Sequence, residues 1–285
     1  MFNSDSIQAA LKSAGLERPL HFFDRTGSTN DDAHHLAEAG APAGTLVIAG
    51  EQTAGRGRAG RLWRSPPGAS LSMSLILRPQ GLPLASLGTL AMLGGLAAAE
   101  ALEVATGVKT ELKWPNDVLL NRRKVCGVLV ETAVAGDRLL YAVVGIGVNV
   151  GRGAEPPPET VTFPATSLEA EAGRPVGRLE VLLELVRRLE LWSTWLGHVQ
   201  SASHLPRMQL PGSAADPESV SPDLAAAWQV RLAFKGETVQ VEAPEGLRQG
   251  IILGVTPEGA LKLRLPTGEI LTVAAGDVRL HPTPS

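Results

Sequence analysis

Several features of secreted and membrane proteins are scarce or missing in this sequence of 285 residues. It contains one cysteine, which excludes an internal disulfide framework. No uninterrupted apolar run reaches the roughly 18 residues that a membrane span needs. The N-terminal stretch has an early acidic residue, Asp5, and lacks the long apolar segment of a signal peptide. These absences predict a cytoplasmic protein without a membrane segment.

A strong positive charge is also missing, because the net charge is −3. Domains that bind nucleic acid are usually basic, so this balance argues against general nucleic-acid binding. The six histidines are scattered, and none stands near the cysteine at a zinc-ligand spacing. The sequence also contains no G-x-x-x-x-G-K-[ST] motif, which excludes a P-loop. We therefore expect neither general nucleic-acid binding nor a transition-metal site.

The pattern of apolar and polar residues predicts an α+β protein of two units joined by a linker. Strands are expected at 45–50, 71–79 and 139–150, with a hairpin at 117–132 that turns at Asn121–Arg123. Helices are expected at 5–15, 31–40, 84–107 and 179–196. The first unit would span 1–205, a Pro- and Ser-rich linker or long loop 206–224, and the second unit 225–285. Short alternating runs predict a small β-barrel in the second unit, with strands at 230–234, 238–243, 250–255, 260–265 and 269–274.

A segment rich in glycine and arginine, GRGRAGRLW at 55–63, follows the first predicted strand. Its glycines have the G-x-G-x-x-G spacing of a dinucleotide-binding turn, but Pro66 and Pro67 forbid the helix that such a turn must open. Three interpretations remain: a flexible solvated loop, an RNA-binding patch, and a lid that binds an anion through backbone N–H groups and arginines. Because its arginines repel one another, we expect 55–64 to be mobile until an anion binds.

Three further segments carry polar residues that a purely structural chain does not need. Gly27–Asn30 (GSTN) places two hydroxyls and an amide at a helix start, where N-capping explains only one of them. Lys113–Asp117 (KWPND) sets a rigid Trp-Pro pair between a cation and an Asn-Asp pair. Lys124 begins an apolar strand in which Gly127 lets a ligand come close. Taken singly, the last two also fit structural roles, a turn and a surface lysine.

In order along the chain, STN, EQTAGRGRAGRLW, KWPNDV, RKVCGVLVE and GIGVNV closely resemble the biotin protein ligases. The resemblance covers roughly residues 20–200 and extends to a small C-terminal barrel; lipoate ligases share the fold but not the paired Arg-Gly loop and KWPND motifs. It implies a class II synthetase-like α+β catalytic domain, with a mixed or antiparallel sheet packed on helices, followed by an SH3-like barrel. Only about 20 residues precede the first motif, so we expect the form without an N-terminal DNA-binding domain.

The resemblance also implies a two-step activity. Biotin and ATP form biotinyl-5′-AMP and pyrophosphate, with Mg²⁺ as cofactor. The biotinyl group then passes to a lysine of a biotin carboxyl carrier domain of acetyl-CoA carboxylase or a related carboxylase. A possible homodimer, with no DNA or membrane partner, belongs to the same expectation. Alternatives are lipoate or octanoate transfer on the same fold, a non-enzymatic biotin-adenylate sensor, and an RNA-binding Arg-Gly protein.

The family's motifs imply a set of site residues in this chain. Those for biotin are Ser28, Thr29, Asn30, Gln52, Arg56, Gly57, Arg58, Lys124, Gly127 and Leu129. Those for ATP are Arg58, Arg61, Trp63, Lys113, Asn116, Asp117 and Asn149. The resemblance gives catalytic roles to Lys124, Arg56 and Asp117, with Lys124 facing the charge that grows in the transition state.

Two of these residue assignments carry alternatives of their own. Asp117 would either hold Mg²⁺ or help to deprotonate the acceptor lysine, and both roles stay open. Asn149 would lie beside the adenine or be a strand-end amide satisfied by the backbone. Cys126 lies in an apolar strand and is expected to be a buried small residue, not a nucleophile.

Overall fold

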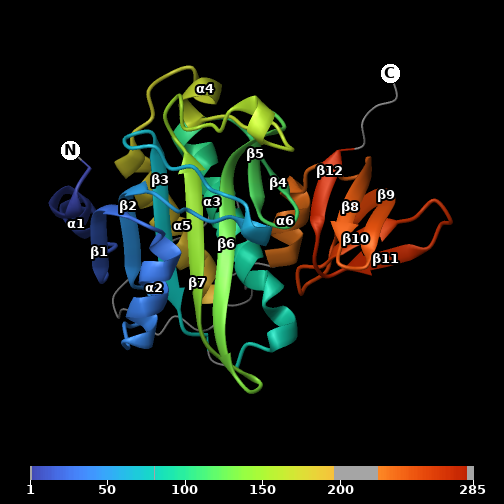
Figure 1. The fold of residues 1–285 in the computed structure, drawn as a ribbon, viewed down its shortest axis with the longest axis horizontal. Helices are drawn as coiled ribbons and strands as arrows, with labels where there is room; N and C mark the ends of the chain where they lie inside the picture. The colour runs from blue at the N-terminus through green and yellow to red at the C-terminus, as the bar shows by residue number, and fades with distance from the viewer. Residues whose placement is uncertain (1, 80, 196–223, 281–285) are drawn as a thin grey trace, which may run out of the picture.

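The computed structural model of the chain describes residues 2–79, 81–195 and 224–280. Its larger unit is built on a seven-stranded sheet with the order β1-β2-β3-β7-β6-β5-β4 (Figure 1). The strands are β1 (Leu20–Thr26), β2 (Leu46–Gln52), β3 (Ser70–Leu77), β4 (Thr110–Lys113), β5 (Asp117–Leu120), β6 (Arg123–Ala135) and β7 (Arg138–Asn149). β1 and β2 are parallel and the other neighbours antiparallel, so the expected mixed sheet is confirmed. The predicted linker at 206–224 lies outside the described residues except for Leu224.

Helices cover both faces of this sheet. In the described residues they are α1 (Ser4–Ser13), α2 (Thr29–Glu38), α3 (Gly88–Thr106), α4 (Leu168–Ala172), α5 (Arg178–Trp195) and α6 (Leu224–Arg231), with short 3-10 turns η1 (Arg58–Gly60), η2 (Leu84–Ser86) and η3 (Pro158–Thr160). The four helices expected from the sequence correspond to α1, α2, α3 and α5, with slightly different ends. α2 lies on one face of the sheet, in front in Figure 1, and α3 and α5 lie on the other.

Helix α3 is apolar on nearly all sides because it lies between the sheet, α5 and α6. The segment Leu84–Thr106 is long and apolar enough to cross a membrane by composition, with a mean hydropathy of 1.4, but 61% of that window is buried in the fold. Gly94 faces the sheet, where an added Cβ would lie 2.9 Å from a methyl group of Val128. Its missing side chain therefore lets the helix approach the strands closely.

The alternation of side chains along the strands determines which face carries the site. Val47, Ile76 and Val143 project toward α2 and pack with its Ala33 and Ala37. Beyond the N-terminus of α2, the same face of the sheet carries serines and glycines in place of these apolar residues. The change from large to small side chains leaves a hollow at the N-terminal end of α2.

The smaller unit is a five-stranded antiparallel sheet with the order β11-β10-β9-β8-β12, as an SH3-like barrel requires. Its strands are β8 (Thr238–Ala243), β9 (Gly246–Val255), β10 (Leu261–Arg264), β11 (Ile270–Val273) and β12 (Asp277–Leu280). Four of them match predicted strands. The prediction of a strand at 230–234 is wrong, and the fifth strand is β12.

The segment 230–234 continues from α6, a helix that is not expected from the sequence. Leu224, Ala225 and Trp228 lie on one side of α6 and are buried against α3 and β4. The alternation in VRLAF is typical of a strand, but the residues before it favour a helix. Packing of these residues on α3 and β4 stabilises the helix, which ends at Arg231.

The two units share an interface and one continuous core. Trp114 donates from Nε1 to the carbonyl of Gly259 at 2.9 Å, and Trp228 donates to that of Met92 at 2.8 Å. Arg122 in the β5–β6 turn pairs with Glu237 in the smaller unit at 2.8 Å. Because these contacts fix the smaller sheet beside β4 and β5, its residues can take part in a site on the larger one.

Candidate active site

A cavity of about 1010 Å³ lies on the α2 side of the larger sheet, under the 55–64 loop and beside the smaller sheet. All of the site residues expected from the sequence line it, namely Ser28, Thr29, Asn30, Gln52, Arg56, Gly57, Arg58, Arg61, Trp63, Lys113, Asn116, Asp117, Lys124, Gly127, Leu129 and Asn149. They come from segments up to 121 residues apart in the chain, which is the separation of Ser28 and Asn149. The fold therefore brings the separate motifs to one place.

One end of the cavity is a network of short polar side chains. Gln52 accepts from the backbone N–H and the hydroxyl of Thr29, at 2.8 and 3.1 Å. Ser74 donates to Thr29 at 2.8 Å or to Asn30 at 2.7 Å. Ser28 occupies the N-cap position of α2 and is buried, yet its side chain makes no capping hydrogen bond. N-capping therefore does not account for its hydroxyl.

Glycine residues, which have no side chain, form the floor of the cavity. Gly127 on β6 and Gly147 on β7 are register partners, and Gly145 is two residues away on the same face. A Cβ on Gly145 would lie 2.1 Å from Asn30 Oδ1, and one on Gly147 would lie 2.3 Å from Trp63. The close approach of these two side chains thus requires glycine at both positions.

Trp63 closes the cavity from the loop side. Its ring lies on Gly127 and Gly147, with the Lys124 ammonium 5.5 Å from the ring centroid. Its Nε1 is buried without a hydrogen-bond partner among the described residues. Buried indole N–H groups are usually satisfied, so this donor is available to a ligand oxygen.

The KWPND motif forms the connection of the β4–β5 hairpin. Lys113 and Asp117 are register partners at the ends of the two strands, so their side chains lie on the same face. Trp114 points the other way and is buried in the core. The three-residue Trp-Pro-Asn turn explains the spacing, because it sets a cation directly opposite a carboxylate.

Asp117 lies between two ammonium groups. Its carboxylate oxygens are 2.6 Å from Lys124 Nζ and 3.2 Å from Lys113 Nζ. Burial alone would raise the pKa of Asp117, but the attraction of Lys124 and Lys113 outweighs it and the pKa is lowered. Burial alone would lower the pKa of Lys113, but Asp117 and Asp277 raise it. Asp117 and Lys113 are therefore both charged at neutral pH.

This arrangement bears on the roles considered for Asp117. A carboxylate that is engaged with two lysines presents no free oxygen pair to Mg²⁺, and a lowered pKa makes it a weak base. Within 2–79, 81–195 and 224–280, no group of three or more His, Cys, Asp or Glu residues could hold a metal ion. The residues of this cavity therefore do not fit a resident Mg²⁺ site, and the geometry favours Asp117 as an anchor for the lysines.

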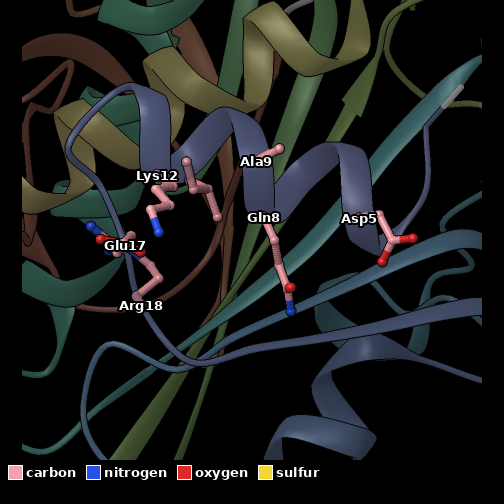
Figure 2. A pocket seen from close by; sticks show the side chains of 7 residues that line it. Asp5, Gln8, Ala9, Lys12, Glu17 and Arg18 are labelled. Carbon is pink, nitrogen blue, oxygen red and sulfur yellow. The ribbon is translucent and has the colours of Figure 1, made fainter.

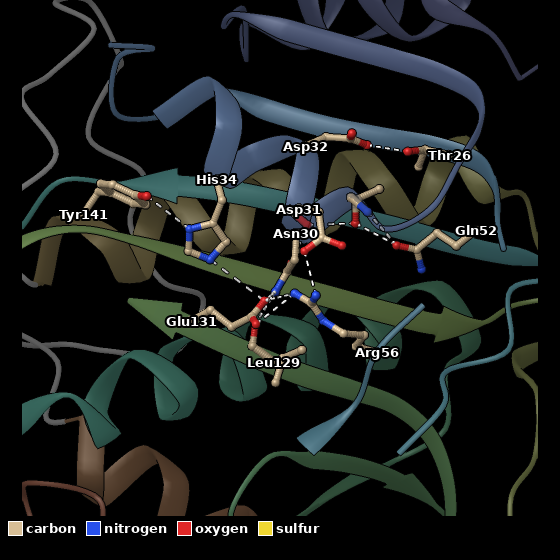
Figure 3. A network of polar contacts seen from close by, with 12 residues as sticks. Thr26, Asn30, Asp31, Asp32, His34, Gln52, Arg56, Leu129, Glu131 and Tyr141 are labelled. Carbon is tan, nitrogen blue, oxygen red and sulfur yellow. Dashed lines mark hydrogen bonds and ion pairs between the residues drawn. The ribbon is translucent and has the colours of Figure 1, made fainter. Parts of the chain in front are cut away.

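The arginines of the loop differ in their partners. Arg56 pairs with Asp31 at 2.7 Å and with Glu131 at 2.9 Å, and Asn30 donates to the same Glu131 at 2.7 Å (Figure 3). Arg61 pairs with Asp277 at 2.5 Å. Carboxylates from elsewhere thus offset much of the repulsion on which the expectation of a mobile loop rested. For Arg56 to bind a ligand carboxylate beside Lys124, it would have to leave Asp31 and Glu131.

Arg58 differs from Arg56 and Arg61. It has no ion pair within the described part of the chain, and burial lowers its pKa, with Asp277 and Asp117 offsetting only part of this effect. A cation that has lost water without gaining a direct partner is a favourable site for an anion.

Two asparagines of the cavity are held by the backbone. Asn116 donates from Nδ2 to the carbonyl of Val128 at 2.6 Å, and Asn149 donates to that of Thr166 at 3.0 Å. These bonds fix the orientation of both side chains in the cavity wall. Cys126 is fully buried on β6, and burial raises the pKa of its thiol, in agreement with the expectation that it is no nucleophile.

Several residues of the site were not predicted. Ser72 accepts a hydrogen bond from the lining residue Gln52, and Gly145, Gly147 and Asp277 line the cavity themselves. The alternation of serine with apolar residues in SLSMSLIL, and the two glycines spaced by two in GIGVNV, were signals for the first three. Nothing in the sequence near Asp277 pointed to a site.

A second hollow, of about 440 Å³, lies beside α1 and the segment that follows it (Figure 2). Its lining mixes charges of both signs, Asp5, Lys12, Glu17 and Arg18 among them. Arg18 already pairs with Glu190 at 3.2 Å. None of the expected site residues lies there, so the chemistry concentrates in the larger cavity.

Comparisons with known proteins agree with this geometry. Residues 22–149 match the biotin/lipoate A/B protein ligase family, and residues 234–280 match the biotin protein ligase C-terminal domain. A biotin–[acetyl-CoA-carboxylase] ligase of Paracoccus denitrificans is 36% identical over 257 residues, which cover 88% of this chain and 96% of that protein. The bifunctional ligase/repressor BirA of Bacillus spizizenii is 32% identical over 279 residues, which cover 98% of this chain and 79% of that protein. The chain belongs to the biotin protein ligase family.

A solved structure of another family member supports the same assignment. The biotin protein ligase of Aquifex aeolicus, in complex with biotin and ATP, superposes with a TM-score of 0.72 at 29% identity. The superposition covers 94% of this chain and all of that one. The fold expected for a biotin protein ligase, a catalytic α+β unit with a small C-terminal sheet, is thus confirmed over both units.

Proposed function

We propose that this protein is an ATP-dependent biotin protein ligase. It joins biotin and ATP to biotinyl-5′-AMP and pyrophosphate, and then transfers the biotinyl group to a lysine of a carrier domain. The observation that carries the proposal is the polarity of the cavity, with short neutral polar groups at one end, a glycine floor, and Lys124, Lys113 and Arg58 at the other. Family membership supports the same activity.

Biotin has the matching shape and chemistry. Its urea needs a few donors and acceptors, which Thr29, Asn30 and Gln52 supply in an otherwise apolar pocket. Gly127 and Leu129 on β6 line the cavity along the flat bicycle and acyl chain of biotin. Its carboxylate then points to the cationic end.

The first step brings two anions together. The carboxylate oxygen attacks the α-phosphorus, the bond between α-phosphorus and bridging oxygen breaks, and pyrophosphate leaves. Lys124 and Arg58 offset the repulsion and the charge that develops on the α-phosphate, with Asp117 keeping Lys124 in place. Trp63 and Asn149, which also line the cavity, are the residues for the adenosine part.

In the second step a carrier lysine attacks the acyl carbonyl and AMP leaves. The lysine must lose a proton first, because its ordinary pKa is near 10.4. Asp117 is not suited to accept that proton, since both its oxygens are engaged with ammonium groups. Its part in this step is to keep the cations beside the leaving phosphate.

We further propose that Mg²⁺ is required and enters as a complex with the ATP phosphates. The cavity lacks a carboxylate cluster that would hold it beforehand in the described ranges. The carrier domain of a carboxylase as acceptor, a cytoplasmic location, a homodimer, the absence of DNA binding and the unit boundaries at 205 and 225 remain predictions of the sequence.

The first step can be tested without a carrier protein. Purified protein is incubated with Mg²⁺, ATP and biotin, with lipoate in a parallel sample, and analysed by native mass spectrometry. A retained mass of biotinyl-5′-AMP, absent with lipoate, is expected. A preference for lipoate or octanoate would move the activity to the related acyl ligases. The absence of any adenylate from folded protein would contradict the proposal.

The residue assignment is tested by Lys124→Met, which keeps the length of the side chain and removes its charge. We expect kcat for adenylate formation to fall about a hundredfold or more, because a charge that stabilises the transition state is lost. Arg122→Ala is the matched control, since Arg122 is an exposed cation two residues away whose partner is Glu237. An equal loss in both variants would contradict a specific role for Lys124.

A further inference from the structure

Asp277 belongs to the smaller sheet, lines the cavity and forms ion pairs with two residues of the larger unit. It begins β12, and its two oxygens bind cations from two different parts of the larger unit, Arg61 at 2.5 Å and Lys113 at 2.9 Å. We propose that Asp277 is a positioning residue that holds the glycine–arginine loop, residues 55–64, closed over the cavity. The inference deepens the proposed ligase function and rests on it only for the consequences on the adenylate.

The contacts of Asp277 form part of a row of alternating charges. From the loop inward, the row runs through Arg61, Asp277, Lys113, Asp117 and Lys124. It begins on the loop and ends at Lys124, whose ammonium lies 5.5 Å from the ring centroid of Trp63 on the same loop. Both ends of this row of charges thus contact the loop, one through Arg61 and the other through Trp63.

The backbone of Asp277 is held in place by the pairing of its strand. Its strand, β12, pairs with β8 from Asp277↔Glu242 to Leu280↔Val239, and a Cβ on the preceding Gly276 would lie 2.7 Å from the carbonyl oxygen of Glu242. The side chain of Asp277 is 20% exposed and that of its second partner, Lys113, is 3% exposed. The loop partner Arg61 is 49% exposed, so Arg61 is the member that can move away.

The loop's own hydrogen bonds do not replace this attachment. Trp63 donates to the carbonyl of Gly55 at 2.8 Å and Gly57 to that of Arg61 at 2.7 Å, so these bonds close the loop on itself. They keep its shape but do not join it to the smaller sheet. Arg61 supplies that link, as Arg56 supplies one on the opposite side through Asp31 and Glu131.

This assignment has a direct consequence for the enzyme cycle. A loop held by Asp277 retains the adenylate and excludes water until the carrier lysine arrives. Weakening the attachment therefore raises the rate at which the adenylate leaves, with a smaller effect on its formation. The smaller sheet thereby takes part in the active site without contacting the reacting atoms.

The test uses the full-length protein and begins without ligand. Hydrogen–deuterium exchange is measured for peptides that cover 55–63 in Asp277→Asn and in Arg61→Gln. Asp277→Asn keeps an acceptor for Lys113, and Arg61→Gln leaves the pair of Asp277 with Lys113 intact, so each variant removes the loop contact with little change elsewhere. We expect exchange of the loop amides to become about threefold faster or more in both variants.

The matched control is Glu237→Gln, which also removes an ion pair between the two units, with Arg122 at 2.8 Å, but lies away from the cavity. Loop exchange in this variant is expected to equal that of the wild type. Unchanged loop exchange in both Asp277→Asn and Arg61→Gln, or an equal increase in the control, would overturn the inference, whatever the chemistry of the ligand.

The second measurement is the dissociation rate of the adenylate formed in the wild type and in the same variants. We expect about threefold faster release or more in Asp277→Asn and Arg61→Gln, with a non-additive double variant. Because loop exchange is read in the free protein, a failure of adenylate formation contradicts the ligase proposal alone. Faster exchange without faster release would refute the retention role of Asp277.

Discussion

Cys126 carries a thiol, a nucleophilic group, but its buried environment makes this thiol unreactive. It lies on β6 opposite Val118 on one side and Val148 on the other, and it is fully buried. Burial favours the neutral thiol and raises the pKa of Cys126, although Lys124 acts in the opposite sense. A thiol of this kind contributes volume to the core and no nucleophile to the cavity.

We therefore expect the native protein to resist thiol reagents. At pH 8, Cys126 should react with Ellman's reagent at least about a hundredfold more slowly in the native protein than in guanidinium, because both access and thiolate are lacking. The guanidinium sample provides the control for total thiol. Rapid labelling of the folded chain, without loss of structure by circular dichroism, would contradict the burial described here.

Gly147 illustrates how a missing side chain can define a binding surface. Gly147→Ala places a Cβ 2.3 Å from Trp63, so the indole must move off the floor of the cavity. We expect a loss of about 1–3 kcal/mol in the free energy of unfolding and a fall of about tenfold or more in kcat/KM for biotin. Urea unfolding and steady-state kinetics measure the two effects.

A suitable control for Gly147→Ala is Gly136→Ala in the β6–β7 turn. Gly136 has a positive φ of 61°, so alanine there costs stability, while no neighbour lies within 4 Å of an added Cβ and the cavity is not touched. Loss of kcat/KM in the turn variant to the same degree would show that stability, and not the floor of the cavity, limits activity.

At the scale of elements, the ends of β4, β5 and β6 act together. Each contributes one charged residue, Lys113, Asp117 and Lys124 respectively, to a cluster in which Asp117 is shared by both cations. Removing the central carboxylate leaves two cations close together, one of them almost fully buried. Buried pairs that lose one partner are typically destabilised by about 3–5 kcal/mol.

The effect of Asp117→Asn on stability should depend on pH in a defined way. Because the folded-state pKa of Asp117 is lowered, its stabilisation is complete above its ordinary pKa near 3.9 and is lost only as the pH falls through the lowered value. The raised pKa of Lys113 means that its contribution persists up to its ordinary value near 10.4 and is lost only as the pH rises through the raised one.

We therefore expect wild type and Asp117→Asn to differ by about 3 kcal/mol or more in urea unfolding at pH 5, 7 and 9 alike. Glu169→Gln on α4 removes a carboxylate outside the cavity and serves as the control. A difference that disappears between pH 5 and 9 would mean that the charges of the cluster titrate in that range, against the assignment.

The sequence predicted best those elements whose signals are local. The KWPND spacing, the long Ala- and Leu-rich run of α3 and the apolar face of α5 depend on neighbours along the chain, and these elements were found. β1, β4 and β12 were missed. β4 and β12 are four residues long and β1 ends in polar residues, so these strands acquire their structure from pairing with β5, β8 and β2 respectively.

The same distinction holds for the site. Ser28, Lys124 and the other motif residues could be named because they occur in short recognisable strings. Asp277 could not, because its partner Lys113 lies 164 residues away and only the fold brings the two together. The roles of Arg56 and Asp117 were equally out of reach, since they depend on which carboxylates and lysines the fold places beside them.

At the scale of the whole molecule, the core is continuous. One cluster of buried residues contains Val128 of the larger sheet, Trp228 of α6 and Val241 of the smaller sheet. Trp228 and Trp114 each donate to a carbonyl, of Met92 and Gly259 respectively, along the interface. Neither unit can lose its structure without exposing apolar surface of the other.

We accordingly expect the protein to unfold in a single cooperative transition. Tryptophan fluorescence, which reports on Trp114 and Trp228 at the interface, and far-UV circular dichroism should give the same urea midpoint within error. The wild-type fluorescence of unfolded and refolded samples provides the check of reversibility. Two separate midpoints would indicate that the smaller sheet unfolds independently.

The cavity is lined by residues from Ser28 to Arg279, and the charge row passes through Asp277. During synthesis, the ribosome releases the serines, the loop and KWPND long before β12 has been made. Until that strand is in place, Lys113 lacks one of its two carboxylates and the loop lacks its second attachment. A nascent chain of this protein is therefore expected to hold a reactive acyl adenylate poorly until β12 has been made.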